Sequence, residues 1–328
     1  MLNYFFFVSL ITELVRSLAL LLPLLLAVAY ITLFERKILG AIQIRKGPNV
    51  VGLFGLLQPL ADGLKLIVKE LLVPISSTTN LFFLSPIITF VLSIFVLISL
   101  PFSSYEIFFD FDFGIILIFG VSSLGIYGIV LSGWSSNSRY SFLGSLRSTA
   151  QIISYEVSIG LIVQSVLVVV GSINMIKIVE FQSHIWLVFP LFPSFLLFFF
   201  SALAETNRPP FDLPEAESEL VSGYNVEYSG PTFALFFIGE YLNIIASCIL
   251  ITTLFFGGST FTIFNIFIDS SFIFSLKVIF FLFSFIWVRA TLPRFRYDQL
   301  IQLGWKTFLP ISFGWVFFCI CVVILFEF

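Results

Sequence analysis

Runs of apolar residues long enough to cross a membrane recur along the chain, separated by shorter polar segments. About 20 apolar residues in a helix cover the ~30 Å hydrocarbon core of a bilayer. The pattern predicts eight membrane-spanning helices, at about residues 8–34, 81–103, 115–134, 149–171, 185–204, 231–256, 272–290 and 307–326. Because only helices and closed barrels satisfy the backbone inside lipid, we predict an all-α integral membrane protein. Residues 1–328 would form a single polytopic domain.

One further helical pattern, at about residues 52–72, differs from the spans because polar residues recur along it. They follow at spacings of four, three and four residues, at Gln58, Asp62, Lys65 and Lys69. This spacing places them in one stripe of a helix whose other faces are apolar. The pattern is typical of an amphipathic helix lying in the membrane interface. A loop helix packed against the bundle is the alternative, and Pro59 would bend or begin either one.

Composition agrees with a membrane protein and excludes several other classes. Hydrophobic residues make up 59% of the chain and charged residues 11%, against about 25% charged residues in soluble domains. The net charge of -3 gives no indication of nucleic-acid binding. Cys248, Cys319 and Cys321 lie inside apolar runs without C-x-x-C spacing. We therefore expect them to be buried side chains and predict no metal or iron–sulfur site on this chain.

The basic residues predict the orientation in the membrane. Of the 16 lysines and arginines, six lie in residues 35–80, two in 135–148, one in 205–230 and four in 289–306. These segments share one side of the predicted topology, and basic segments face the cytoplasm or, in a mitochondrion, the matrix. With an even number of spans, both termini then lie on the outer side, which is the intermembrane space in a mitochondrion.

Acidic residues gather on the same side as the bases. The stretch AETNRPPFDLPEAESELVSGYNVEY (204–228) holds six of the 19 acids, namely Glu205, Asp212, Glu215, Glu217, Glu219 and Glu227. Two more, Glu156 and Glu240, fall inside predicted spans, about 11 and 14 Å below the basic side at 1.5 Å per residue. A carboxylate at such depth costs roughly 2.5–3.5 kcal/mol and indicates a functional site. We hypothesise a hydrated, carboxylate-lined proton path entering from the basic side.

The alternative is that these acids cap helices or pair with bases. It is favoured at Asp212, because D-L-P-E has capping-box spacing with Glu215 at the third helical position. Gly223 would then end that short helix. It is disfavoured at Glu156 and Glu240, because no base of this chain falls at their depth.

Four stretches of the chain resemble a known family. They are ERKILGAIQIRKGPNVVG (35–52) with QPLADGLKLIVKE (58–70), SLRSTAQIISYEVSIG (145–160), AETNRPPFDLPEAESELVSGYNVEY (204–228) and RATLPRFRYDQLIQLGWK (289–306). In this order, and all on the predicted basic side, they resemble subunit 1 of the respiratory NADH:ubiquinone oxidoreductase (complex I), a family with bacterial plasma-membrane members. The resemblance covers nearly the whole chain. Pro210 is a departure, since many members have a smaller residue there.

The resemblance implies a core membrane subunit of an H⁺-translocating NADH:ubiquinone reductase. Such a subunit anchors the hydrophilic arm, forms the membrane-side part of the quinone tunnel and lines the first carboxylate route toward the pumping subunits. Ubiquinone would be the substrate, while FMN and iron–sulfur clusters would lie on partner subunits. The partners would be the quinone-site and terminal iron–sulfur-cluster subunits of the hydrophilic arm, neighbouring membrane-arm subunits and lipids.

The resemblance also assigns residues. The proton route would use Tyr155, Glu156, Glu205, Asp212, Glu215, Glu217, Glu219, Glu227 and Glu240. The quinone entrance would use Glu35, Arg36, Lys37, Arg45, Lys46, Arg289, Arg294 and Arg296. For Arg294 and Arg296, docking of partner subunits is an equal alternative, because loops on this side carry bases in any case.

Three other functions fit parts of the pattern. A secondary transporter or ion channel would use intramembrane acids, but no inverted repeat is visible. A homologous subunit of a membrane-bound hydrogenase would have a similar acidic loop without reducing quinone. A purely structural anchor leaves Glu156 and Glu240 unexplained. The 45 phenylalanines indicate an AT-rich genome and hence a mitochondrially encoded inner-membrane protein, with the bacterial plasma membrane as the alternative.

Overall fold

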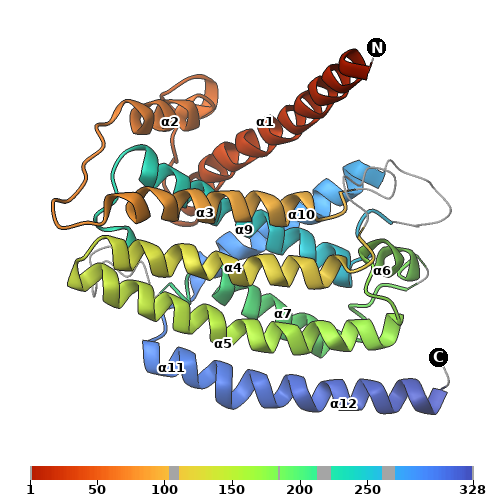
Figure 1. The fold of residues 1–328 in the computed structure, drawn as a ribbon. Coiled ribbons are helices and arrows are strands. Elements are labelled where there is room, and N and C mark those ends of the chain that lie inside the picture. Colours follow the sequence, from red (N-terminus) through yellow and green to blue (C-terminus); the bar gives the residue numbers. More distant parts are fainter. Residues whose placement is uncertain (1, 103–110, 184, 213–222, 261–269, 327–328) are drawn as a thin grey trace. The chain divides into compact units, whose positions relative to one another are not determined.

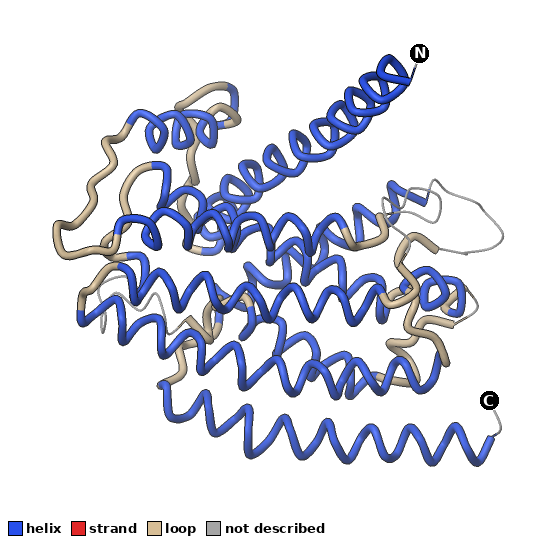
Figure 2. Tube along the Cα trace, viewed as in Figure 1, coloured by secondary structure: helices blue, strands red, loops and turns tan. Residues whose placement is uncertain are grey.

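The computed structural model describes residues 2–102, 111–183, 185–212, 223–260 and 270–326, which form helices and loops without strands (Figure 2). The chain divides into two compact units, Met1–Lys69 and Glu70–Phe328, which we describe one at a time. Three residues predicted for the proton route, Glu215, Glu217 and Glu219, lie outside the described residues.

The first unit consists of a long helix and a short amphipathic one. Its elements are α1 (Leu2–Ile42), the single turn η1 (Leu53–Gly55) and α2 (Gln58–Val68). α2 begins where Pro59 occupies its first turn, a position at which the fixed φ of proline suits a helix and its missing N–H costs nothing. Within the region predicted as an amphipathic helix, 52–72, the structure has a helix at Gln58–Val68, which is shorter at both ends. Lys69 adopts an extended conformation after the helix, so it leaves the predicted polar stripe.

The second unit is a bundle of helices. Its elements are α3 (Thr79–Ile98), α4 (Gly114–Ser135), α5 (Arg139–Val170), α6 (Met175–Phe181), α7 (Phe192–Glu205), the turn η2 (Gly223–Asn225), α9 (Pro231–Phe255), α10 (Ser270–Thr291), α11 (Tyr297–Gln302), the π-helical turn η3 (Leu303–Phe308) and α12 (Leu309–Phe326). α3 packs against α4 and α9, and α5 packs against α4, α7 and α12. Figure 1 shows α3, α4, α5 and α12 as successive rows. α5 therefore lies at the centre of this unit and contacts most of its elements.

Within the described residues, 6 helices are long and apolar enough to cross a membrane, and α7 is apolar but shorter. The six are Thr79–Ile98, Gly114–Ser135, Arg139–Val170, Pro231–Phe255, Ser271–Thr291 and Tyr297–Phe326. The apolar pattern of the sequence is confirmed at these positions.

α5 begins at Arg139, earlier than the predicted start at 149. The sequence between them is rich in serine and therefore looks polar. Ser145 and Ser148 are nevertheless buried, and their hydroxyls donate to backbone carbonyls three residues earlier in the helix, at 2.9 and 2.8 Å. A serine satisfied by its own helix costs little to bury, so the helix extends past the apolar run.

α7 is shorter than the predicted span of 185–204, because Pro190 lies in a turn and the helix starts only at Phe192. Pro193 falls in the first turn of the helix, where proline is tolerated. Aromatic packing anchors what remains. The ring of Phe195 lies 5.4 Å from that of Phe256 after α9, and Phe199 lies 5.3 Å from Phe285 on α10. This packing holds α7 against α10 and the end of α9.

Candidate functional site

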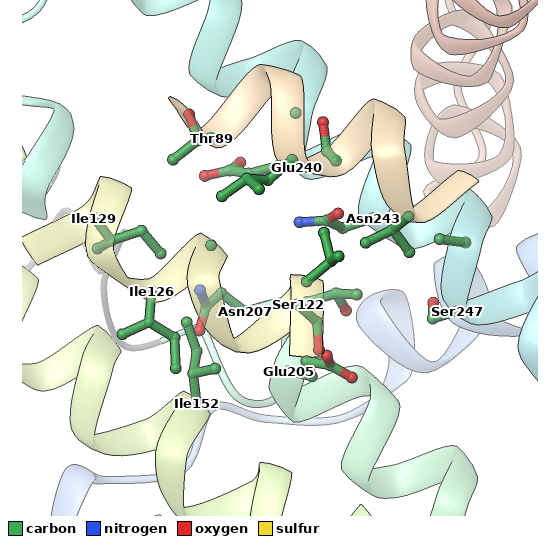
Figure 3. A pocket seen from close by; sticks show the side chains of 18 of the residues that line it. Thr89, Ser122, Ile126, Ile129, Ile152, Glu205, Asn207, Glu240, Asn243 and Ser247 are labelled. Atoms are coloured by element: carbon green, nitrogen blue, oxygen red, sulfur yellow. The ribbon is translucent and has the colours of Figure 1, made fainter. Parts of the chain in front are cut away.

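A cavity lies among α3, α4, α9 and the segment that follows α7 (Figure 3). The space open to the centres of water molecules is about 100 Å³. One water needs only ~10–15 Å³ of such space. The titratable groups that line the cavity are Glu205, Tyr224 and Glu240. Figure 3 shows Glu240 and Glu205 on opposite sides of the group of lining side chains. Two carboxylates predicted for the proton route therefore share one space large enough for several waters.

Hydroxyl groups also line the cavity. Thr89 and Ser93 on α3 and Ser122 on α4 donate to carbonyls of their own helices, at 3.0, 2.8 and 3.0 Å. Their donors are thus occupied, while each hydroxyl oxygen keeps the capacity to accept a further hydrogen bond. Gly128 lets the two helices approach, because a Cβ there would lie 2.3 Å from a methyl carbon of Thr89. This wall accepts hydrogen bonds from water without carrying charge.

Glu205 is the last residue of α7, and the chain beyond it is tied to α5. The side-chain amide of Gln151 on α5 donates to the carbonyls of Ala204 and Phe211, both at 2.8 Å. Asn207 takes the left-handed conformation, with φ of 51°, that asparagine tolerates better than most residues. Its buried side-chain oxygen has no hydrogen-bond partner among the described residues. A water in the adjoining cavity can satisfy it.

Glu240 projects from α9 toward Tyr224 of η2, whose phenol hydroxyl donates a hydrogen bond to one carboxylate oxygen. Tyr224 is 2% exposed, so this bond is shielded from bulk water. Hydrogen bonds to charged groups are stronger than those between neutral groups. The position of the carboxylate within the cavity therefore depends on a residue outside its own helix.

Glu156 lies on α5 one turn beyond Ile152, which lines the cavity. Its carboxyl group lies within electrostatic range of that of Glu205. The adjacent Tyr155 is fully buried and donates its hydroxyl to the carbonyl of Leu300 at 2.9 Å. Glu156 thus belongs to the same acidic group, while the described contact of Tyr155 joins α5 to α11.

Asp212 connects the acidic stretch to the basic loop before α11. Its carboxylate is almost buried and lies 2.9 Å from a guanidinium nitrogen of the half-exposed Arg294. Next to this pair, Phe211 stacks on Phe295 with centroids 5.6 Å apart, and the Phe295 amide donates to the Pro210 carbonyl at 3.1 Å. The proposed helix-capping role of Asp212 involves residues outside the described ranges, so it stays a prediction.

The proposed entrance residues Glu35, Arg36, Lys37, Arg45 and Lys46 lie in the first unit. Glu35 is buried in α1, whereas Arg36 is exposed and forms an ion pair with Asp62 of α2 at 2.7 Å. The remaining bases of the group are partly or fully exposed, and Arg45 donates to the side chain of Gln43 at 2.8 Å. In the second unit, Arg296 is exposed and Arg289 is half-buried.

Tyr228 is a second buried tyrosine, and unlike Tyr224 it bonds to serines rather than to a carboxylate. Its hydroxyl shares hydrogen bonds with Ser85 at 2.9 Å and Ser135 at 3.2 Å, and its ring stacks on Phe82 at 4.1 Å. Burial raises the pKa of this phenol, and the two serine contacts only partly oppose the rise. Tyr228 is thus a neutral structural residue, and the adjacent Glu227 is half-buried outside the cavity.

Comparison with known proteins identifies the family. A sequence model of the NADH dehydrogenase family matches residues 15–320. The chain belongs to this family. NADH-ubiquinone oxidoreductase chain 1 of Chondrus crispus is 56% identical over 312 residues, covering 94% of this chain and 95% of the relative. The corresponding chain of Arabidopsis thaliana is 56% identical over 299 residues, covering 90% and 92%. A bacterial NADH-quinone oxidoreductase subunit, from Paramagnetospirillum magneticum, is 55% identical over 300 residues, covering 91% and 88%.

Membership of the NADH dehydrogenase family confirms the resemblance predicted from the four stretches, and its members named above are subunits of oxidoreductases. Together with the six long apolar helices, it makes the chain a multi-pass membrane protein. Among the described residues, no group of three or more histidine, cysteine or acidic side chains could hold a metal ion.

The structure brings together part of the predicted site and adds residues that the sequence did not indicate. Glu205 and Glu240 share the cavity, with Glu156 beside it. Tyr224 and Asn207 were missed, although both lie inside the acidic stretch, because only its acids were considered. Asn243, one turn after Glu240 on α9, could have been found from helical spacing alone.

Proposed function

We propose that the chain is the core membrane subunit of a proton-pumping NADH:ubiquinone oxidoreductase. It would form the membrane-side part of the quinone tunnel, anchor the hydrophilic arm and line the first carboxylate route from quinone reduction to proton translocation. Ubiquinone is its substrate, and FMN and iron–sulfur clusters lie on partner subunits. The observation that carries the proposal is the cavity shared by Glu205 and Glu240, with Glu156 beside it.

The proposed topology counts α1 and α7 with the six long apolar helices, which gives eight spans. The basic segments then face the mitochondrial matrix, and both termini face the intermembrane space. The mitochondrial inner membrane is the proposed location, and the identity to eukaryotic chain 1 proteins supports it.

The proton route is supported by the chemistry of the cavity wall. Protons move between carboxylates through hydrogen-bonded water, which requires room and acceptors along the way. The cavity has the volume for several waters, and the hydroxyl oxygens of Thr89, Ser93 and Ser122 supply the acceptors. Intramembrane acids that line a water-filled space are typical of proton relays.

The quinone entrance is supported by the first unit. On α2, the apolar side chains of Leu64, Ile67 and Val68 are 63–81% exposed. An exposed apolar helix face beside lysines and arginines suits the membrane interface, where a long-tailed quinone leaves the bilayer. Reduction makes the quinone headgroup transiently anionic, and guanidinium groups such as those of Arg36 and Arg294 stabilise such charge.

Substitution of the intramembrane acids tests the carboxylate route. In the assembled complex, Glu240→Gln and Glu156→Gln should each abolish proton-coupled quinone reduction, because an amide does not carry a proton. Glu180→Gln is the matched control: Glu180 is an exposed acid of α6 outside the cavity, and its variant should work normally. NADH-driven quinone reduction and proton uptake are measured together in proteoliposomes. Normal coupled turnover in both intramembrane variants rules the route out.

A further inference from the structure

Tyr224 connects the end of the acidic stretch with an acid inside the membrane. It belongs to η2, the turn before α9, whereas Glu240 lies well inside α9. Their hydrogen bond therefore connects the turn before α9 with the interior of that helix. Tyr224 also lines the cavity, so its hydroxyl and the Glu240 carboxylate meet at the wall that water reaches.

The backbone of Tyr224 is fixed by α5. The hydroxyl of Ser141 donates to the Tyr224 carbonyl at 3.2 Å. At Gly144, one helical turn further on, α5 touches η2 directly, since a Cβ there would lie 2.7 Å from the backbone of Gly223 and 2.9 Å from the Tyr224 nitrogen. α5 is thus the element that sets where Tyr224 stands.

The ring of Tyr224 is fixed as well. It packs edge-on against Phe236 of α9, with centroids 5.5 Å apart and planes at 76°. Phe82 and Tyr228 complete the buried aromatic cluster around it. Backbone and ring are thus held by separate contacts, and the direction of the hydroxyl follows from both.

We propose that Tyr224 is a positioning residue for Glu240, holding its carboxylate toward the cavity that it shares with Glu205. A glutamate side chain has three rotatable bonds and can point its carboxylate in several directions. The hydrogen bond from a rigidly held phenol selects one of them. This inference rests on the proposed carboxylate route and adds the hydrogen bond that keeps one of its acids in place.

The wall of the cavity around Glu240 carries few titratable groups. Of the residues lining the cavity, Glu205 and Tyr224 are the titratable ones besides Glu240 itself. α3 and α4 face the cavity with the uncharged side chains of Thr89, Ser93 and Ser122. Beyond the cavity wall, Arg208 lies over the ring of the neighbouring Tyr241, 4.5 Å from its centroid.

Tyr224→Phe tests the proposal in the assembled complex, because it removes the hydroxyl and keeps the ring in its cluster. Loss of a hydrogen bond to a charged group should lower kcat for NADH-driven quinone reduction about tenfold. The quinone KM should stay within about twofold, because the proposed quinone entrance uses other residues. Tyr228→Phe is the matched control from the same cluster, and its kcat should be unchanged because its hydroxyl bonds to serines.

Glu240→Asp provides the second measurement. Its shorter side chain already withdraws the carboxylate from the Tyr224 hydroxyl, so adding Tyr224→Phe should lower kcat by less than about twofold more. Unchanged kcat in Tyr224→Phe, equal losses in both tyrosine variants, or losses that multiply with Glu240→Asp would each overturn the proposal. If Glu240→Gln is inactive but Tyr224→Phe is normal, only the role of Tyr224 is wrong. A normal Glu240→Gln variant contradicts the proposed carboxylate route itself.

Discussion

The cavity around Glu205 and Glu240 and the α1–α2 unit use similar residues in opposite settings. At the cavity, Tyr224 is buried and held by contacts with both α5 and α9. In the α1–α2 unit, the Arg36–Asp62 pair is 51% and 37% exposed. The apolar face of α2 is exposed beside it.

The two regions therefore differ in how much structural change they tolerate. Buried polar groups are costly unless their partners are in place, so the geometry of the cavity tolerates little change. Exposed ion pairs are screened by water and contribute little to stability. The exposed Arg36–Asp62 pair of the α1–α2 unit therefore contributes little to stability, whereas the Tyr224–Glu240 bond near the cavity is shielded from water.

Of the substitutions that test this comparison, Gly144→Ala should have the largest effect. The added methyl group would meet the backbone of Gly223 at 2.7 Å, and a backbone neighbour cannot rotate away. Overpacking of this kind costs about 1–3 kcal/mol. The displaced η2 would carry Tyr224 away from Glu240, so we expect a roughly tenfold loss of kcat, measured per assembled complex.

Gly160→Ala on the same helix is the control for Gly144→Ala. Its Cβ would meet nothing within 4 Å. Replacing a helical glycine by alanine favours the helix by roughly 0.5–1 kcal/mol, so assembly and turnover should be normal. Similar losses in both variants would show that α5 needs flexibility rather than a close contact at Gly144.

Arg294→Ala should have an intermediate effect. It removes the guanidinium from the nearly buried Asp212 carboxylate, which should cost about 1–3 kcal/mol. The midpoint of thermal inactivation of the complex should fall, and Asp212→Asn added to Arg294→Ala should restore part of it. Arg296→Ala, in the same loop but exposed, should change stability by less than about 0.5 kcal/mol.

The same variant separates the two roles predicted for Arg294. A raised apparent KM for quinone in a fully assembled complex indicates a direct role at the quinone. Failure of the complex to assemble indicates docking of partner subunits. A thermal midpoint equal to that of Arg296→Ala would contradict the structural importance of the pair with Asp212.

The six long apolar helices and the family could be predicted from the sequence, because the helices depend on local composition and the family on residue order. The sequence also singled out Glu156, Glu205 and Glu240, since acids stand out inside apolar runs, and Glu205 and Glu240 line one cavity in the structure. It placed the start of α5 too late because hydropathy counts a serine as polar even where its hydroxyl bonds to its own helix.

The contacts between elements could not be read from the sequence. The pairing of Asp212 with Arg294 joins residues that are 82 positions apart. The bond from Tyr224 to Glu240 depends on how η2 packs against α5, which no local pattern encodes. Tyr224 and Tyr228 stand four residues apart in similar surroundings, and only the fold shows that one faces a carboxylate and the other two serines.

Asp62→Ala should have the smallest effect. The Arg36–Asp62 pair is exposed on both sides, so its loss should change stability by less than about 1 kcal/mol. Arg36→Ala breaks the same ion pair but also removes the base that we propose for the quinone entrance. The quinone KM should therefore rise in Arg36→Ala and stay constant in Asp62→Ala, at equal thermal midpoints. If both variants raise the KM equally, the ion pair itself shapes the entrance, and the α1–α2 unit is as tightly constrained as the cavity.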